Sequence, residues 1–158
     1  MPRYQARIPM RWNDMDAYGH VNNVVFLTYL EEARIEMFAE FDAGPGRGML
    51  SQGVVVARSD IEYLRPLVHR HDPLPIDVWC FKVGGASFSI GYEVHDDERP
   101  GDDGDVVPPV VYARAHSVMV PYDFAREVPR RITPVEREFL RAHFEERDPV
   151  GAGRPRPA

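Results

Sequence analysis

The sequence is short of cysteine and lysine. Cys80 is the only cysteine among 158 residues, so the chain can form no internal disulfide and no multi-cysteine zinc site. Such cysteine usage is typical of a reducing compartment, and we expect a cytoplasmic protein. Lys82 is the only lysine among the 19 basic residues, a bias that by itself indicates no function.

Positive charge and long apolar runs are lacking too. The net charge of -6 argues against a general nucleic-acid binder, which needs a basic face for phosphate. It does not exclude a small anionic ligand, because a few placed arginines suffice for that. No stretch of 18 apolar residues occurs, and residues 1–10 hold no apolar run of signal-peptide length. We therefore expect neither a membrane span nor a secretory leader.

The length and composition indicate one globular domain. A chain of 158 residues can bury about 68–70% of its unfolded surface. An apolar content of 44% and a charged content of 28% are ordinary for such a domain. We expect the domain to span residues 1–148 and the glycine- and proline-rich residues 149–158 to form a disordered tail.

Two kinds of apolar periodicity follow one another near the start. Residues 4–12 alternate apolar and polar side chains from Tyr4 to Trp12, which predicts a half-buried strand. Residues 24–41 carry apolar side chains at spacings of three and four, which predicts an amphipathic helix. This stripe consists of Phe26, Leu30, Ala33, Met37 and Phe41. Glutamates on the opposite side predict a solvated face rather than a metal site.

The rest of the chain is rich in strand patterns. The predicted strands are residues 53–65, 75–83, 86–95 and 109–120. Gly84 and Gly85 predict a hairpin turn, and residues 96–105 an acidic loop. Thr133 and Glu136 predict a capping box, with Pro134 at the first helical position, that begins a short second helix. This order predicts an α+β fold in which an antiparallel sheet packs on one long helix, with sheet edges that a homodimer could pair.

Polar residues gather just before the long helix. Asn22 or Asn23 can cap the helix, whose free N–H groups and dipole favour developing negative charge. Asp16 and His20 flank Gly19, which permits a close approach of the backbone to a ligand. A carboxylate beside an oxyanion-binding helix end could drive attack on a carbonyl. The alternative is a purely structural role, in which Asp14 and Asp16 form turns and His20 packs locally.

At these residues the sequence resembles a known family. The stretch "DMDAYGHVNNVVFLTYLEEAR" is similar to the signature of the 4-hydroxybenzoyl-CoA thioesterase-like branch of hotdog-fold acyl-CoA thioesterases. The resemblance extends through "SDIEYLRPL", "ASFSIGYEV" and "PRRITPVEREFL" and covers roughly residues 5–145. It implies a hotdog fold, in which a five-stranded antiparallel sheet wraps around the long helix. It also implies acyl pockets at the interface of a homodimer, often within a homotetramer.

The resemblance also implies roles for individual residues. Asp16, the second aspartate of the motif, resembles the catalytic carboxylate, acting as nucleophile or as general base on water. The backbone N–H of Asn23 resembles the donor that polarises the thioester carbonyl. His20 resembles a residue that lines the reacting centre, whereas Asp14 is expected to shape the loop. We expect the protein to need no metal or organic cofactor.

The turn at residues 84–86 departs from the family, whose members often carry a basic residue there for coenzyme A phosphate. Arg126, Arg130 and Arg131 are the alternative candidates. The carrier thus stays open between coenzyme A and an acyl-carrier protein, and a non-catalytic module that binds acyl thioesters is a further alternative. The "HRHD" stretch at residues 69–72 lacks a fixed partner for a metal site. We expect an acyl-CoA thioesterase, with acyl-CoA as its substrate partner.

Overall fold

The computed structural model describes residues 3–42 and 48–151 of the chain. The helices are η1 (a 3-10 turn, Trp12–Asp14), α1 (Asn23–Phe41), α2 (Met49–Gln52) and α3 (Pro134–Ala142). The strands are β1 (Tyr4–Ile8), β2 (Val54–Tyr63), β3 (Leu74–Val83), β4 (Phe88–His95), β5 (Arg99–Pro100), β6 (Val106–Val107), β7 (Val111–Asp123) and β8 (Val128–Pro129). Their order confirms the α+β prediction.

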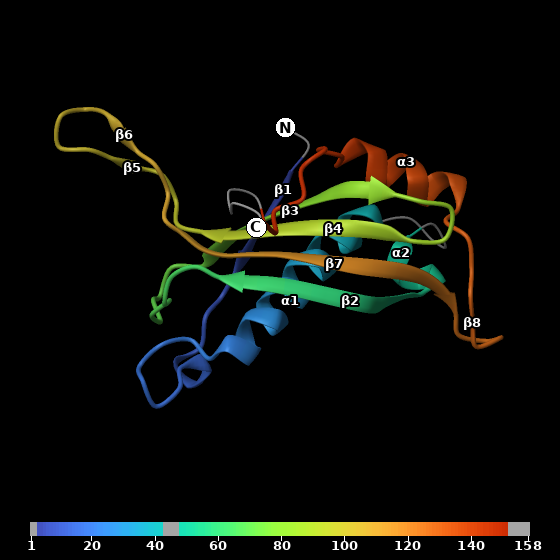
Figure 1. Cartoon of the computed structure of the whole chain (residues 1–158), viewed down its shortest axis with the longest axis horizontal. Helices are drawn as coiled ribbons and strands as arrows, with labels where there is room; N and C mark the ends of the chain where they lie inside the picture. Colours follow the sequence, from blue (N-terminus) through green and yellow to red (C-terminus); the bar gives the residue numbers. More distant parts are fainter. Residues whose placement is uncertain (1–2, 43–47, 152–158) are drawn as a thin grey trace, which may run out of the picture.

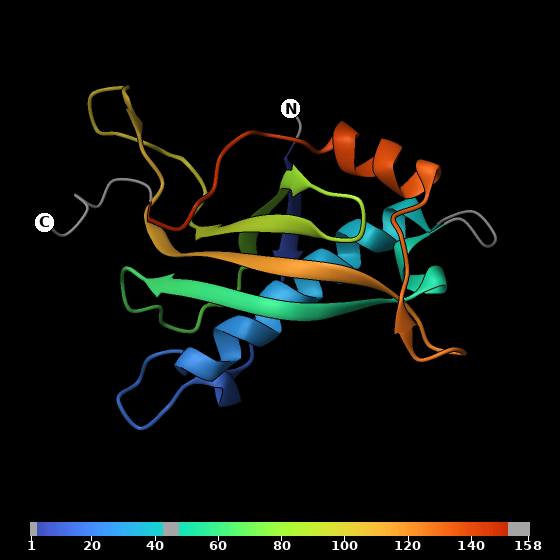
Figure 2. The same ribbon diagram turned by 45° about the vertical axis from the view of Figure 1, so that its right-hand side comes forward.

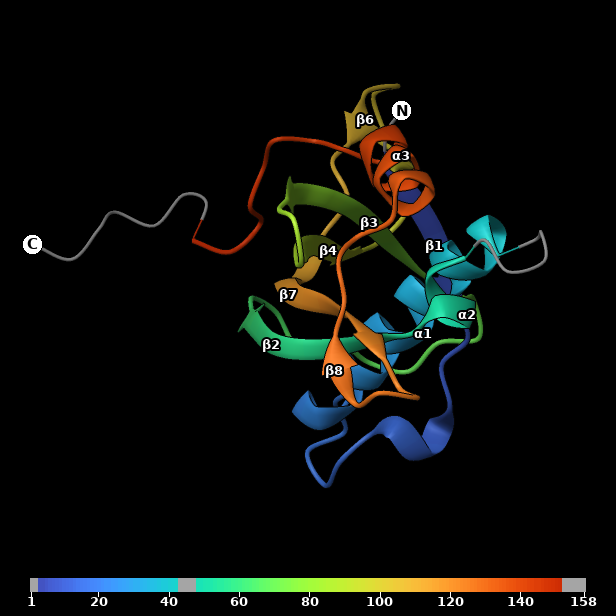
Figure 3. The ribbon, with the colours of Figure 1, turned by 90° about the vertical axis from the view of Figure 1, so that its right-hand side faces the viewer.

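The main sheet is antiparallel, with five strands in the order β1-β3-β4-β7-β2 and the short β8 added to β7 (Figure 1). Strand β2 pairs along its whole length with β7, from Val54 opposite Pro121 to Tyr63 opposite Ala113. Within the described residues its other edge pairs with no strand. The end-on view shows the sheet curving around α1 (Figure 3).

Helix α1 fills the concave side of the sheet because its apolar stripe meets the inward side chains of the strands. Phe26, Leu30, Ala33 and Met37 are buried, as the periodicity predicts. On the sheet, alternate residues such as Ile90 and Tyr92 complete this core. Other apolar side chains of α1 lie at the surface; these are Val24 (64% exposed), Leu27 (42%) and Ile35 (43%). In this single chain, α1 therefore leaves apolar surface without a partner.

The first strand is shorter than predicted. It ends at Ile8, and the chain then turns into η1, where Trp12 is 75% exposed instead of facing the core. Pro9 has no N–H to donate to a ladder, and Asp14 accepts a hydrogen bond from the backbone N–H of Arg11 at 2.9 Å. The strand prediction for residues 4–12 was thus wrong beyond its first half.

The acidic loop at residues 96–105 is also not purely irregular. The chain at its two ends pairs as the two-stranded ribbon β5–β6, which projects from the sheet (Figure 2). Both residues of β6, Val106 and Val107, are exposed. The predicted hairpin at Gly84 and Gly85 is present and closes with a bond from the Gly84 N–H to the Ser87 carbonyl at 2.8 Å.

The segment after α3 crosses the outer face of the sheet. The indole of Trp79 donates to the Arg147 carbonyl at 2.8 Å, and Pro149 lies against Gly91 and Trp79. The Gly151 N–H donates to Glu62 at 2.6 Å, so this segment reaches from β3 to the edge strand β2. The first residues of the predicted tail, 149–151, thus pack on the sheet. Residues 152–158, like residues 43–47 of the predicted turn after α1, lie outside the described residues.

None of the helices in the described part of the chain is long and apolar enough to cross a membrane. Cys80 is buried in the core, as its alternation with Val78 predicts, and burial raises the pKa of its thiol to about 12. The thiol is therefore held protonated, which makes it an inert core residue.

Candidate active site

The polar segment before α1 folds into a tight loop. Met15 and Val21 form an isolated antiparallel bridge, and inside it the Asp16 N–H donates to the His20 carbonyl at 2.8 Å. Gly19 donates to the Asp16 carbonyl at 3.1 Å and has a φ of +75°, a conformation that disfavours other residues. The motif glycine therefore allows the turn that brings Asp16 and His20 together.

Asp16 itself is half-buried, and only one of its two carboxylate oxygens bonds within the loop. Its Oδ1 accepts a hydrogen bond from the Tyr18 N–H at 2.9 Å, which fixes the carboxylate. Its Oδ2 has no partner among the residues that the structure describes. One oxygen of Asp16 thus stabilises the turn, as the structural alternative predicts, and the other oxygen is available to a ligand.

Helix α1 begins beside this carboxylate. Asn22 is its N-cap, because its side-chain oxygen accepts from the Val24 N–H at 3.0 Å. Asn23 is the first helical residue, so its N–H has no intrahelical acceptor, and no other described residue accepts from it. This free N–H, with the positive end of the helix dipole, can bind developing negative charge.

All three predicted site residues line one cavity of about 310 Å³. Asp16, His20 and Asn23 line it together with Val21, Phe26, Tyr63, Leu64, Arg65, Pro66 and Leu67. A second hollow of about 480 Å³ lies between η1, the loop and residues 68–69, and Asp16 lines both hollows. Asp16 therefore stands at the wall between two possible substrate positions.

Tyr63 and Arg65 also line the Asp16 cavity, and the sequence analysis did not single them out. The Tyr63 hydroxyl donates to the Asn23 carbonyl at 2.8 Å, and its ring packs edge-on against Phe26 at a centroid distance of 5.4 Å. Tyr63 thus braces the first turn of α1 from the end of β2. The available signal was its position, an aromatic residue that ends an alternating strand shortly before Pro66.

Asp14 serves the loop, as expected. It is 3% exposed and accepts from the Tyr29 hydroxyl at 2.6 Å as well as from Arg11. Its burial opposes ionisation, but the hydrogen bonds from Tyr29 and Arg11 outweigh this and hold the pKa of its carboxyl below the usual range. Asp14 also stays away from both hollows.

The three arginines suggested for phosphate binding belong to the β7–β8 turn and the segment that follows β8, which lie at the opposite end of the sheet from the loop before α1 (Figure 1). Arg130 is occupied, because it donates to Glu136 at 2.7 and 3.0 Å and to the Gly53 carbonyl at 2.8 Å. Arg126 stands in the β7–β8 turn with 82% of its side chain exposed. Arg131 is exposed beside Gly85. None of them lines either hollow at Asp16.

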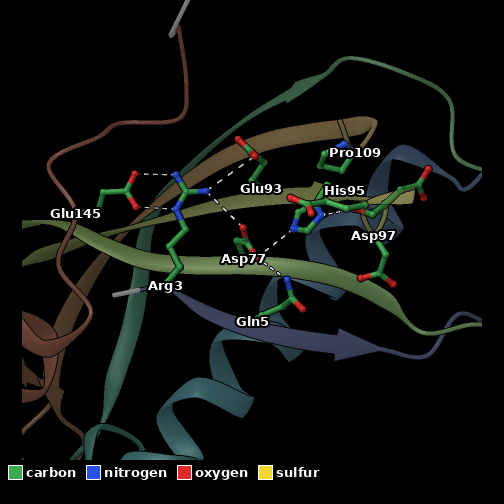
Figure 4. Close-up of a pocket in the computed structure, with 10 residues that line it drawn as sticks. Arg3, Gln5, Asp77, Glu93, His95, Asp97, Pro109 and Glu145 are labelled. Carbon is green, nitrogen blue, oxygen red and sulfur yellow. Dashed lines mark hydrogen bonds and ion pairs between the residues drawn. The ribbon is translucent and has the colours of Figure 1, made fainter. Parts of the chain in front are cut away.

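A larger cavity of about 770 Å³ lies elsewhere, on the outer face of the sheet. Its lining is charged, and part of these charges are paired with one another: Arg3 with Glu145, Asp77 and Glu93, and His95 with Asp77 (Figure 4). Arg3 bonds Glu145 at 2.7 Å and lies 3.4 Å from Asp77, and Arg7 bonds Asp97 at 2.7 Å. Through Arg3, the residue just before β1, this network ties the C-terminal segment to β1 and β3.

His95 gives this network a pH dependence. Nδ1 lies 2.6 Å from the Asp96 carbonyl and Nε2 lies 3.0 Å from Asp77, so both nitrogens can donate when the ring is protonated. Burial lowers the pKa of His95, but the hydrogen bonds to Asp77 and to the Asp96 carbonyl, together with the nearby charges of Asp77 and Glu93, outweigh it, so the pKa is raised above its usual 6.5.

We therefore expect the free energy of unfolding to contain a His95 contribution that is complete below pH 6.5. It is lost as the pH rises through the raised pKa of the folded state. Chemical denaturation at a series of pH values measures this, and His95→Gln should flatten the slope. The exposed His71→Gln is the matched control; an unchanged slope in His95→Gln would show that the ion pair is unimportant.

The "HRHD" residues do not form a metal-binding group. In residues 3–42 and 48–151, no three His, Cys, Asp or Glu side chains lie close enough to hold a metal ion. His69 instead packs edge-on against Trp12, at a centroid distance of 5.8 Å.

The curved sheet around a single long helix, with polar residues at the start of that helix, defines a hotdog fold. A family model described as the thioesterase-like superfamily matches residues 10–143. The chain therefore belongs to the thioesterase-like superfamily, and the expectation of a hotdog-fold thioesterase is confirmed at the level of the family.

Solved structures and a curated relative agree with this. A thioesterase from Thermus thermophilus, solved with coenzyme A and Zn, is 30% identical, with a TM-score of 0.66 over 98% of this chain and 97% of that one. A 4-hydroxybenzoyl-CoA thioesterase shares the fold at a TM-score of 0.66 with 18% identity, over 87% of this chain and 96% of that one. The long-chain acyl-CoA thioesterase FadM of Escherichia coli is 36% identical over 64 residues, 40% of this chain and 48% of FadM. The chain spans about half the length of the curated relatives it matches.

Proposed function

We propose that this protein hydrolyses acyl-CoA thioesters to a free carboxylic acid and coenzyme A. The observation that carries this proposal is the shared cavity, which has a carboxylate with a free oxygen beside the start of α1. The thioesterase family model and the relatives that act on or bind coenzyme A compounds support the choice of substrate.

In this mechanism the thioester carbonyl lies at the start of α1. Its oxygen accepts a hydrogen bond from the Asn23 N–H, and the helix dipole stabilises the negative charge that develops there. The Tyr63 hydroxyl donates a hydrogen bond to the Asn23 carbonyl and thereby holds the first residue of α1 in place. The polarised carbonyl carbon then becomes open to attack.

Asp16 drives the attack in one of two ways. As a nucleophile it forms a mixed anhydride with the acyl group and releases the coenzyme A thiolate, after which water hydrolyses the anhydride. As a general base it takes a proton from a water molecule that attacks the carbonyl directly. Both routes use only groups of this chain and water, so we propose no metal or organic cofactor. Exposed His20 lines the same cavity and is proposed to contact the substrate near the thioester.

The cavity is completed, in this proposal, by a second copy of the chain. It lies at the surface next to the free edge of β2, where Tyr63 is 45% exposed. Val24 and Leu27, apolar residues in the first turns of α1, are exposed as well. Pairing of two β2 edges would bury this surface, so we propose a homodimer, alone or within a homotetramer.

The experiment that tests the function is release of thiol from a panel of acyl-CoAs, from short aliphatic to long-chain and aromatic. We expect turnover for part of the panel, with the preferred chain revealing the length of the acyl pocket. Absence of thiol release from every acyl-CoA, with turnover of acyl-carrier-protein thioesters, would transfer the assignment to that carrier. Binding without release from either carrier would leave a non-catalytic module.

A further inference from the structure

The segment between β2 and β3, residues 64–73, lines both hollows at Asp16. Residues 64–67 belong to the cavity of about 310 Å³, whereas Val68 and His69 belong to the hollow of about 480 Å³. The segment contains no helix or strand. Its position, and with it the shape of both hollows, therefore depends on individual contacts.

The first half of this segment is held by main-chain hydrogen bonds. The N–H groups of Leu64 and Arg65 donate to the Tyr112 carbonyl at 2.8 and 3.1 Å. The Leu67 carbonyl accepts from the Val21 N–H at 2.7 Å, which ties the segment to the loop before α1. The backbone itself therefore keeps this half in place.

The second half is held by a side chain. Arg70 donates through Nη1 to Oδ1 of Asp96, which follows β4 and is 3% exposed. The same carboxylate accepts from the Tyr112 hydroxyl at 2.9 Å and from Arg99 at 3.2 Å. Within the described residues, no other hydrogen bond or ion pair joins residues 68–73 to the sheet. The position of this half therefore depends on the Arg70–Asp96 pair.

Asp96 is a buried carboxylate that stays ionised. Burial opposes its ionisation, but the hydrogen bonds from Arg70 and Tyr112 and the positive charges nearby outweigh this and hold the pKa of its carboxyl below the usual range. A charge removed from water needs its partners in good geometry. Only 26% of the Arg70 side chain is exposed, against 70% for Arg99, so Arg70 is the more firmly held of the two. Because Arg70 directly follows His69, the pair fixes the residues that line the hollow.

The hollow of about 480 Å³ suits the acyl part of a thioester. The two hollows share Asp16 and no other residue. With the carbonyl oxygen at the start of α1, the acyl chain and the thiol arm leave the carbonyl carbon in different directions, so the hollow beyond Asp16 receives one of them. Trp12, Met15 and Val68 give this hollow apolar surface, on which an acyl chain leaves water favourably. The amide groups of the thiol arm would lose hydrogen bonds to water there.

We propose that the Arg70–Asp96 pair positions the wall of this acyl-binding hollow and so determines which acyl groups fit. The inference rests on the proposed function. Neither residue of the pair lines the hollow, so both act through their neighbours and not on the reacting atoms. His69 transmits the effect, because its ring packs edge-on against Trp12 at a centroid distance of 5.8 Å and thus joins the two sides of the hollow.

The kinetic test uses the longest and the shortest acyl-CoA that the wild type hydrolyses. Arg70→Met keeps the apolar stem of the side chain and removes its charge. We expect it to raise KM for the longest acyl-CoA about tenfold or more, as for the loss of a hydrogen bond to a charged group, with kcat unchanged. KM for the shortest acyl-CoA should stay at the wild-type value, because residues 64–67 keep their main-chain bonds.

Two further variants separate positioning from folding. Arg70→Lys restores a cation and should return KM for the longest acyl-CoA towards the wild-type value. Arg99→Met removes the exposed partner of the same carboxylate and should leave all constants unchanged. A loss of folded protein would instead lower kcat for both substrates at unchanged KM. That pattern, or an equal rise of KM for both substrates, would overturn the proposal.

A second measurement does not depend on hydrolysis. The chain has two tryptophans: Trp12 lines the hollow, and the indole of Trp79 donates to the Arg147 carbonyl on the outer face of the sheet. Their two indole N–H signals can be followed by NMR in ¹⁵N-labelled protein and assigned with Trp12→Phe. We expect Arg70→Met to shift the Trp12 signal, because the ring of His69 moves, and to leave the Trp79 signal in place. An unmoved Trp12 signal would overturn the positioning role.

The two measurements keep this inference separable from the proposed function. If no acyl-CoA is hydrolysed but the Trp12 signal moves in Arg70→Met and not in Arg99→Met, the proposed function fails and the positioning of the wall stands. If acyl-CoA is hydrolysed and neither KM nor the Trp12 signal responds to Arg70→Met, only this inference fails.

Discussion

Replacing Asp16 by asparagine is expected to lower kcat for the preferred acyl-CoA by about 100-fold or more. Such a loss corresponds to about 2.7 kcal/mol of transition-state stabilisation. The amide oxygen can still accept the hydrogen bond from the Tyr18 N–H, so the loop keeps its geometry. What disappears is the charge on the oxygen that faces the cavity, and an amide can neither attack the carbonyl nor take a proton from water.

The measurement is a full kinetic profile of Asp16→Asn next to its melting temperature. We expect KM to change little and the melting temperature to stay within a few degrees, because the substituted side chain is only half-buried. Asp72→Asn, an exposed aspartate that lines neither hollow at Asp16, is the matched control. Full activity of Asp16→Asn would leave the family assignment intact and move the catalytic carboxylate elsewhere.

Much of the fold could be predicted because its signals are local. Helix α1 was expected from residue 24 and begins at Asn23, where Asn22 provides the cap that its residue type favours. The capping box of α3 is present, with the Thr133 oxygen accepting from the Glu136 N–H at 3.2 Å and Glu136 bonding back to Thr133. These contacts span three residues and can be read from spacing alone.

The parts that were missed depend on residues far apart in the sequence. Strand β1 ends at Ile8 because its partner β3 begins at Leu74, a limit that no local pattern of β1 contains. The packing of Pro149 depends on Trp79 and Gly91, whose open surface exists only once β3 and β4 are paired.

In the candidate site, too, the residues that lie close together in the sequence could be predicted and the distant one could not. Asp16, His20 and Asn23 belong to one short motif, so the sequence places them within one loop and one helix turn. Tyr63 joins them from the end of β2, 40 residues after Asn23 along the chain. Only the antiparallel sheet brings that strand end to the start of α1. The sequence pointed to Arg126, Arg130 and Arg131 as candidates for phosphate binding because they lie near the last strand, but this proximity does not show that Arg130 is already paired with Glu136.

Replacing Asp14 by alanine is expected to destabilise the protein by about 3 kcal/mol, a large fraction of the stability of an ordinary domain. Its carboxylate is 3% exposed and holds three groups: the Tyr29 hydroxyl at 2.6 Å, the Arg11 backbone N–H at 2.9 Å and the Arg11 guanidinium. Alanine leaves the buried Tyr29 hydroxyl without its acceptor, which costs more than the hydrogen bond itself contributes. Urea denaturation measures the loss.

Tyr29→Phe is the matched variant, because it removes the same hydrogen bond but leaves no buried hydroxyl without a partner. We expect it to cost about 1 kcal/mol, clearly less than Asp14→Ala. The two aspartates of the motif should then separate by readout, with Asp14 variants losing stability and Asp16→Asn losing turnover. An Asp14→Ala protein as stable as the wild type would contradict this structural role. Equal stability with lost turnover would instead make Asp14, and not Asp16, the carboxylate that acts on the thioester.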